Sequence, residues 1–324
     1  MDILDREYKV SVIVPIYNVE EYIEKCARSL FAQTLDDIEY IFVNDCTPDN
    51  SIEVLLHVIE EYECLKHRIT IINNETNLGL AQTRDVGLKA SHGKYIYNCD
   101  SDDWVETNML EVMYNKAIEE DADMVCCNIV LERLDSRTIY RYPYSYETLE
   151  NGLLALKFGE LYNGIWNKLI KRDLYFKNHI WHYPGINMGE DSAVTVRLRY
   201  FSKKTVIVPA IFYHYNRSNV NSMCIQLPST AIYQYIELSN YLEIFFIEQN
   251  ERIRFRVVIS ALKFISKQNI LRQERDYSKW YSIFPESHQY IFKYSFLSRL
   301  GRFKWYLCAH LPYIFKLIIK PKGN

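Results

Sequence analysis

The sequence predicts an α/β fold with a mostly parallel sheet and flanking helices over residues 1–222, followed by a mostly α-helical region over 223–324. Two observations predict it. From residue 10 onward, short apolar runs rich in β-branched residues alternate with stretches in which apolar residues recur at helical spacing. Beyond about residue 227 only the helical spacing continues. Strands that alternate with helices imply right-handed crossovers, which make neighbouring strands parallel.

The first half of the chain is expected to form five strands and four helices in alternation. The run VSVIVPIY at 10–17 has the continuous apolar character of a strand buried on both faces. The other expected strands cover 40–45, 68–73, 94–100 and 122–130, and the helices cover about 19–31, 51–62, 80–90 and 107–120. Ligands of such sheets bind beyond the carboxyl ends of the strands. The residues that follow each strand are therefore the first candidates for a site.

Composition narrows the class of protein. The net charge of −3 provides no basic field for nucleic acid. The eight cysteines include no C-x-x-C pair, which argues against structural zinc and for reduced thiols in the cytoplasm. The N-terminal residues are charged and acidic, unlike a secretory signal, and no apolar run reaches the roughly 18 residues of a spanning helix. We therefore expect a cytoplasmic protein without a nucleic-acid partner.

Polar and acidic residues collect at the predicted strand ends. Pro15 and Tyr17 end the first strand, Asp45 ends the second, and Asp100 and Asp102 follow the fourth. Helix capping explains about one such residue per helix. It does not explain three aspartates within four positions directly after a buried strand. We therefore interpret this acidic edge as functional.

The positions of the glycines exclude two common classes of nucleotide-binding domain. The first glycine of the chain is Gly79, so the first strand-to-helix turn lacks the glycines of a dinucleotide-binding domain. A phosphate-binding loop of the Walker type is also missing. The nearest stretch separates Gly87 and Gly93 by five residues instead of four, and Tyr95 stands where Ser or Thr is required.

Three stretches together resemble a known family. SVIVPIYN, FVNDCTPDNS and NETNLGLAQTRDVGLKASHGKYIYNCDSDDW look like the N-terminal half of family 2 inverting glycosyltransferases with the GT-A fold. The match covers 11–104 in order, and a weaker match continues to about residue 222. The resemblance implies a nucleotide-binding half over about 10–104 and an acceptor half over 105–222. The region from 223 to 324 matches nothing recognisable.

The resemblance implies a role for each matched position. Pro15, Tyr17 and Asp45 would line the nucleoside pocket, Arg84 would approach the base or the diphosphate, and Asp100 and Ser101 would contact the donor. Asp102, assisted by Asp100, would bind Mn or Mg. Asp191 would be the catalytic base, with Glu190 as its rival, and Trp166, Lys168 and Glu190 would lie on the acceptor side. The chain has TRD where the family usually has ARN, which leaves the role of Asp85 open.

The chemistry of sugar transfer suits these residue types. Negative charge develops on the departing diphosphate, and a hard divalent cation held by carboxylates stabilises it. Inverting displacement also requires a carboxylate that removes the proton of the acceptor hydroxyl, and this residue must differ from the metal ligand. The expected donor is a nucleotide diphosphate sugar, most plausibly a UDP-sugar carrying a hexose or N-acetylhexosamine. The expected acceptor is a hydroxyl of a saccharide or lipid-linked saccharide in cell-surface polysaccharide synthesis.

The C-terminal region predicts contact with a membrane surface. The segment 296–322 is rich in aromatic and aliphatic residues, carries six cations, and no acidic residue follows Glu286. This composition is typical of an in-plane helix on the anionic inner face of the cytoplasmic membrane. The alternative is a helix that packs on the rest of the protein with a basic outer face. Two other functions also stay open: a metal-dependent nucleotidyltransferase or phosphohydrolase, and a non-catalytic scaffold that binds sugar nucleotides.

Overall fold

The computed structural model describes residues 8–141, 149–150, 153, 163–219, 222 and 231–311. The chain divides into two compact units. One, here called the sheet unit, comprises Met1–Tyr144 and Gly164–Leu227; the other, the helical unit, comprises Ser145–Asn163 and Pro228–Asn324. The boundary expected between 222 and 223 adjoins residues outside the described part and stays a prediction.

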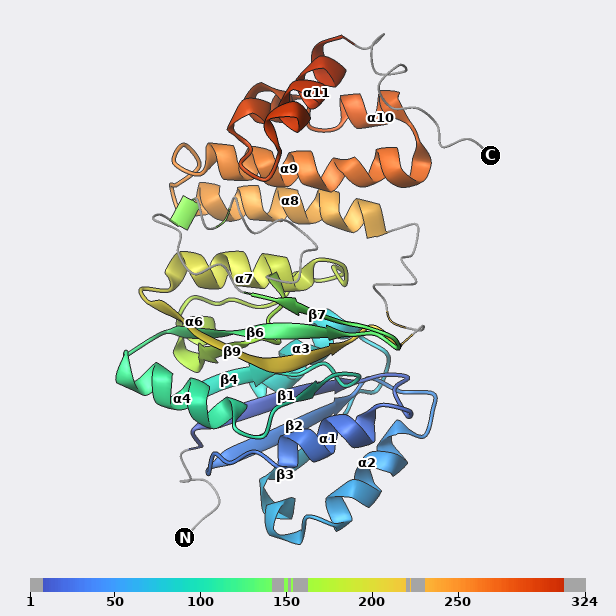
Figure 1. Ribbon diagram of the computed structural model, residues 1–324, viewed down its shortest axis with the longest axis vertical. Helices are drawn as coiled ribbons and strands as arrows, with labels where there is room; N and C mark the ends of the chain where they lie inside the picture. Colours follow the sequence, from blue (N-terminus) through green and yellow to red (C-terminus); the bar gives the residue numbers. More distant parts are fainter. Residues whose placement is uncertain are drawn as a thin grey trace. The chain divides into compact units, whose positions relative to one another are not determined.

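Within the described residues, nine strands of the sheet unit form one sheet (Figure 1). Its order is β3-β2-β1-β4-β8-β6-β9-β5, with β7 paired to β6. The strands are β1 (Val10–Ile16), β2 (Ile38–Asn44), β3 (Ile69–Asn73), β4 (Tyr95–Asn98), β5 (Trp104–Val105), β6 (Met124–Glu132), β7 (Arg137–Tyr140), β8 (Lys168–Lys171) and β9 (Thr205–Asn216). Pairing is parallel from β3 through β4 and between β6 and β9, and β5, β7 and β8 run against the others.

Helices cover both faces of this sheet (Figure 1). They are α1 (Ile23–Phe31), α2 (Ser51–Glu60), α3 (Leu80–Lys89), α4 (Met109–Glu119), α6 (Arg172–Lys177) and α7 (Glu190–Phe201), with a short 3-10 turn at Glu63–Arg68. Side chains of α3, α6 and α7 share one buried cluster with Ile13 of β1 and Ile96 of β4. All seven residues of β1 are buried. Successive side chains of a strand point to opposite faces of the sheet, so both faces must be covered by helices.

The expected α/β fold is confirmed, and so are the strands and helices predicted up to residue 130, with ends shifted by a few residues. The largest shift is at α1, where the apolar stripe begins at Val19 but the helix begins at Ile23. The residues between them form a turn, in which Val19 O accepts a hydrogen bond from Ile23 N. β5, β7, β8 and β9 were not predicted as strands.

The helical unit has its own core. Its elements are α8 (Ala231–Glu248), α9 (Arg256–Asn269), a π-helical turn at Ile270–Glu274, α10 (Tyr277–Ser282), a 3-10 segment at Pro285–Lys293, and α11 (Arg299–His310). Residues of all of them pack around the buried Trp280 and Phe264. Across the described residues, each helix is too short or too polar to cross a bilayer. The expected helical C-terminal region is therefore confirmed as far as residue 311, and residues 312–322 of the predicted membrane segment lie outside the described part.

Candidate active site

A cavity of about 400 Å³ opens beyond the carboxyl ends of β1, β2 and β4. These strands are neighbours in the sheet, so residues as far apart in the chain as Pro15 and Asp102 meet there. Six residues predicted from the sequence line this cavity: Pro15, Tyr17, Asp45, Asp100, Ser101 and Asp102. Among the other lining residues are Thr83, Asn187, Tyr215, Asn219 and Ser222. The sheet order therefore turns the separate strand ends into one site.

Asp45 organises the loop on one side of the cavity. Its carboxylate accepts hydrogen bonds from the backbone N–H of Leu78 at 2.8 Å and of Gly79 at 2.9 Å, and from Asn74 Nδ2 at 2.8 Å. Gly79 has a φ of 82°, and a Cβ there would lie 2.6 Å from the Asn187 side chain. Only glycine fits this position without strain. Asp45 therefore fixes the loop that precedes α3 in addition to lining the cavity.

Asp102, the residue expected to bind a cation, lines this cavity. Asn219 Nδ2 donates a hydrogen bond to its Oδ2 at 2.8 Å. Burial, followed by the nearby charge of Asp100, raises the pKa of Asp102 to about 6. The described residues contain no cluster of three His, Cys, Asp or Glu side chains suited to a metal. Mg²⁺ and Mn²⁺ fit a pair of carboxylates nevertheless, because substrate phosphates and water supply their remaining oxygen ligands.

Arg84 is placed differently from the expectation. We expected it to approach the base or the diphosphate, but it is only 1% exposed and does not line the cavity. Its guanidinium contacts three carboxylates: Asp100 Oδ1 at 2.5 Å, Glu190 Oε1 at 2.8 Å and Asp191 Oδ1 at 2.8 Å. The planar fork of arginine can satisfy several carboxylates at once. Arg84 therefore joins the strand-end acidic motif to the start of α7.

The two acidic residues at the start of α7 have different environments. Gly189, in a left-handed conformation, precedes the helix, so neither Glu190 nor Asp191 is its N-cap. The Glu190 side chain is 9% exposed and that of Asp191 is 16% exposed. Burial, with a smaller contribution from the neighbouring Asp191, raises the pKa of Glu190 above its ordinary value. Both carboxylates bond to Arg84, and neither is among the residues that line the cavity.

Helix α3 anchors the segment that leads to these acids. Asp85 accepts hydrogen bonds from the backbone N–H of His182 at 3.1 Å and pairs with His182 Nδ1 at 2.7 Å. Near the start of the helix, Ala81 N donates to Asn187 Oδ1 at 3.2 Å. The aspartate that departs from the family pattern thus has a structural partner. His182, which from the sequence could be taken for a metal ligand, is buried in this contact.

The predicted acceptor residues lie in the interior. Trp166 is 4% exposed and its ring stacks on Tyr213 with centroids 4.6 Å apart. Lys168 is fully buried and its ammonium donates to Asn167 Oδ1 at 2.7 Å. Burial lowers the pKa of Lys168 to about 8. Neither residue lines the cavity. Lys168 belongs to β8, an inner strand between β4 and β6, so its buried position differs from the expectation of an acceptor contact.

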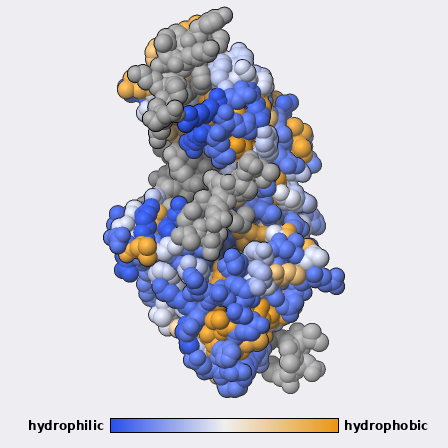
Figure 2. Space-filling model, turned by 90° about the vertical axis from the view of Figure 1, so that its right-hand side faces the viewer, coloured by the Kyte–Doolittle hydropathy of each residue, from blue (hydrophilic) through white to orange (hydrophobic). Residues whose placement is uncertain are grey.

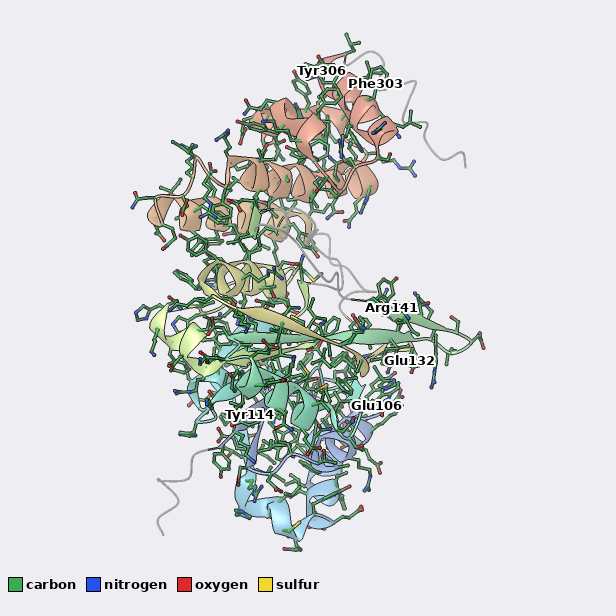
Figure 3. All side chains as sticks on the ribbon, turned by 60° about the vertical axis from the view of Figure 1, so that its left-hand side comes forward. Glu106, Tyr114, Glu132, Arg141, Phe303 and Tyr306 are labelled. Carbon is green, nitrogen blue, oxygen red and sulfur yellow. The ribbon has the colours of Figure 1, made fainter. Side chains whose placement is uncertain are left out.

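A second cavity, of about 390 Å³, adjoins the first at Asp102. One of its walls contains Trp104, whose ring stacks on His214 at 5.1 Å. His214 in turn contacts Glu132 at 2.8 Å and Glu106 at 2.9 Å, the two glutamates labelled in Figure 3. His214 therefore has carboxylate partners on both ring nitrogens. Sequence reasoning did not predict this network or the roles of Asn187 and Asn219, since only the folded chain brings these residues together.

Comparisons with known proteins identify the family. The family model described as "Glycosyl transferase family 2" matches residues 11–179, just over half of the chain. The chain belongs to glycosyltransferase family 2. The predicted family and its GT-A fold are thereby confirmed.

Curated relatives and solved structures support the same family and fold. "Putative glycosyltransferase EpsH" of Bacillus subtilis is 34% identical over 64% of this chain and 60% of that protein. The chain thus spans less than two thirds of the length of EpsH. "Cholesterol galactosyltransferase" of Borreliella burgdorferi is 27% identical over 91% of this chain and 90% of that protein. The crystal structure of S. aureus TarS 1–349 in complex with UDP-GlcNAc matches with a TM-score of 0.71 and 18% identity, over 94% of this chain and 91% of TarS.

Proposed function

We propose that this protein transfers a hexose or N-acetylhexosamine from a UDP-sugar to a hydroxyl of a saccharide or lipid-linked saccharide, with inversion, in cell-surface polysaccharide synthesis. The observation that carries the proposal is the cavity at the strand ends. Pro15, Tyr17 and Asp45, which we expect to contact the nucleoside, line this cavity together with the carboxylates of Asp100 and Asp102. The fold neighbour TarS, solved with UDP-GlcNAc, and the sugar-transferring relatives support the same assignment.

In this proposal the donor occupies the cavity with its nucleoside against the loop that Asp45 holds. Tyr17, 49% exposed, offers a ring for stacking on the base. Asp102, with Asp100, would bind Mn²⁺ or Mg²⁺ against the diphosphate. That cation would stabilise the negative charge on the leaving group as a Lewis acid. Asn219 orients the Asp102 carboxylate through its hydrogen bond.

Asp191 would act as the base for the acceptor hydroxyl. It lies at the start of α7, where the helix dipole favours a charged carboxylate. Arg84 bonds both Asp191 and Asp100, so one side chain sets the positions of the base and of the donor-side carboxylate. Glu190 bonds the same guanidinium, and its raised pKa makes it a weaker candidate for a group that must be ionised. In this proposal, separate carboxylates serve the leaving group and the nucleophile.

The decisive experiment measures nucleotide binding and sugar transfer together. UDP with Mn²⁺ should raise the melting temperature more than GDP, dTDP or CMP does, because a ligand of the folded state stabilises it by mass action. Release of UDP from UDP-sugars should require the metal and stop in EDTA. Asp102→Asn should abolish release, whereas Asp49→Asn, at an acidic residue outside the cavity lining, should preserve it. Full activity in chelator, or no stabilisation by any nucleoside diphosphate, would exclude the proposal.

A further inference from the structure

Helix α11 packs Trp305 on the core of the helical unit and leaves several large apolar residues exposed. Its buried residues are Cys308 and Ala309. Leu300 is 82% exposed and Phe303 is 55% exposed, and Leu311, directly after the helix, is 45% exposed. The spacing of these positions places them along one side of a helix. An ordinary surface helix turns its apolar side to the core. Helix α11 carries these large apolar residues on its exposed side as well.

Aromatic residues extend this exposed surface. Tyr306 is 37% exposed, and its ring centroid lies 5.0 Å from that of Phe292 in the preceding 3-10 segment, which is 53% exposed. Phe303 and Tyr306 are labelled on α11 in Figure 3. We call the surface formed by Phe292, Leu300, Phe303, Tyr306 and Leu311 the α11 patch. The face drawn in Figure 2 is mostly hydrophilic, with hydrophobic residues in small groups, so an apolar patch of this kind needs an explanation.

In the segment 287–324, which contains every residue of the α11 patch, all charged residues are basic. Lys293, Arg299 and Lys304 are exposed beside it. In the sequence no acidic residue follows Glu286, whereas Lys316, Lys320 and Lys322 lie beyond the helix. A second copy of the chain would bring two positive surfaces together, which opposes self-association through this patch. A nucleic acid would satisfy the cations but would leave the apolar centre without a partner.

We propose that the α11 patch docks on an anionic lipid surface, with α11 lying in the plane of the membrane. The apolar and aromatic residues would enter the boundary between headgroups and acyl chains, and the surrounding lysines and arginine would contact anionic headgroups. Tyrosine suits this boundary because its ring is apolar and its hydroxyl is polar. Docking concerns the helical unit alone and does not depend on the proposed sugar transfer.

Vesicle co-sedimentation of the full chain tests the proposal. The protein should bind vesicles containing about a third phosphatidylglycerol more tightly than pure phosphatidylcholine vesicles. Binding should weaken between about 0.1 and 0.5 M NaCl, because exposed charges are screened. Leu300→Ser with Phe303→Ser should lower the partition coefficient at least about tenfold, since each side chain contributes apolar area to the contact. The charge variants Arg299→Gln with Lys304→Gln should remove most of the preference for anionic vesicles.

A matched control distinguishes this surface from general hydrophobicity. Ile247 and Ile253 are 46% and 77% exposed elsewhere in the helical unit, so Ile247→Ser with Ile253→Ser removes similar apolar area outside the patch. This variant should bind vesicles like the wild type. Unchanged melting temperature and UDP binding show that each variant is folded. Equal vesicle binding by the patch and control variants would overturn the proposal, as would a wild-type protein that binds no vesicles and dimerises through α11.

Discussion

Arg84 offers the sharpest test of how the site is built. Its side chain is 1% exposed and contacts Asp100, Glu190 and Asp191, whose side chains are 22%, 9% and 16% exposed. Arg84→Gln leaves these three carboxylates without their shared counter-charge. Loss of one partner of a buried ion pair typically costs about 3–5 kcal/mol. At about 2–4 °C per kcal/mol, the melting temperature should fall by about 6–20 °C.

Arg28 provides the control for this substitution. It also contacts two carboxylates, Glu24 at 2.9 Å and Glu61 at 2.7 Å, but its side chain is 36% exposed and theirs are more than half exposed. Exposed pairs of this kind contribute about 0.2–1 kcal/mol, so Arg28→Gln should change the melting temperature by only a few degrees. Thermal unfolding followed by circular dichroism compares the two variants directly.

A double variant separates loss of charge balance from loss of packing. Glu190→Gln removes one of the carboxylates that Arg84 neutralises. In the Arg84→Gln background it should therefore recover about 1–3 kcal/mol, the usual coupling between residues in one ion-pair network. Urea unfolding of the wild type, both single variants and the double variant gives this coupling energy. The ion-pair network would not have the stabilising role given to it here if Arg84→Gln lowered the free energy of unfolding no more than Arg28→Gln does. A coupling energy of zero would refute it as well.

Two further predictions concern the base and the helical unit. Asp191→Asn should lower the transfer rate by about 100- to 10,000-fold with UDP binding retained, and Glu190→Gln should cost less; a larger loss for Glu190→Gln would reverse the two roles. In the helical unit, burial lowers the pKa of Lys267 to about 7, whereas the unfolded chain keeps an ordinary value of about 10.4. Between these values the unfolded state binds more protons, so stability should rise with pH from about 7 to 10. Lys267→Met should lack this contribution, and a wild-type minus variant difference in melting temperature that does not change with pH would contradict it.

Many residues that line the cavity could be predicted from the sequence, because short runs of neighbouring residues are enough to identify a strand end. A buried β-branched run followed by polar residues identifies a strand end, and the parallel sheet brings such ends to one edge. Pro15, Tyr17, Asp45, Asp100 and Asp102 were all found in this way, and all line the cavity.

The roles of other residues depended on contacts across long stretches of chain. Arg84 and Glu190 are 106 positions apart, and only the packing of α3 against the start of α7 turns the arginine toward the acids and away from the cavity. Lys168 has a polar side chain, yet its strand pairs between β4 and β6 and so its ammonium is buried. The sequence by itself determined which strand ends line the cavity, since side-chain alternation and strand ends are local properties. The tertiary structure decided which charged groups face the cavity, because burial and pairing depend on elements that meet only in the folded chain.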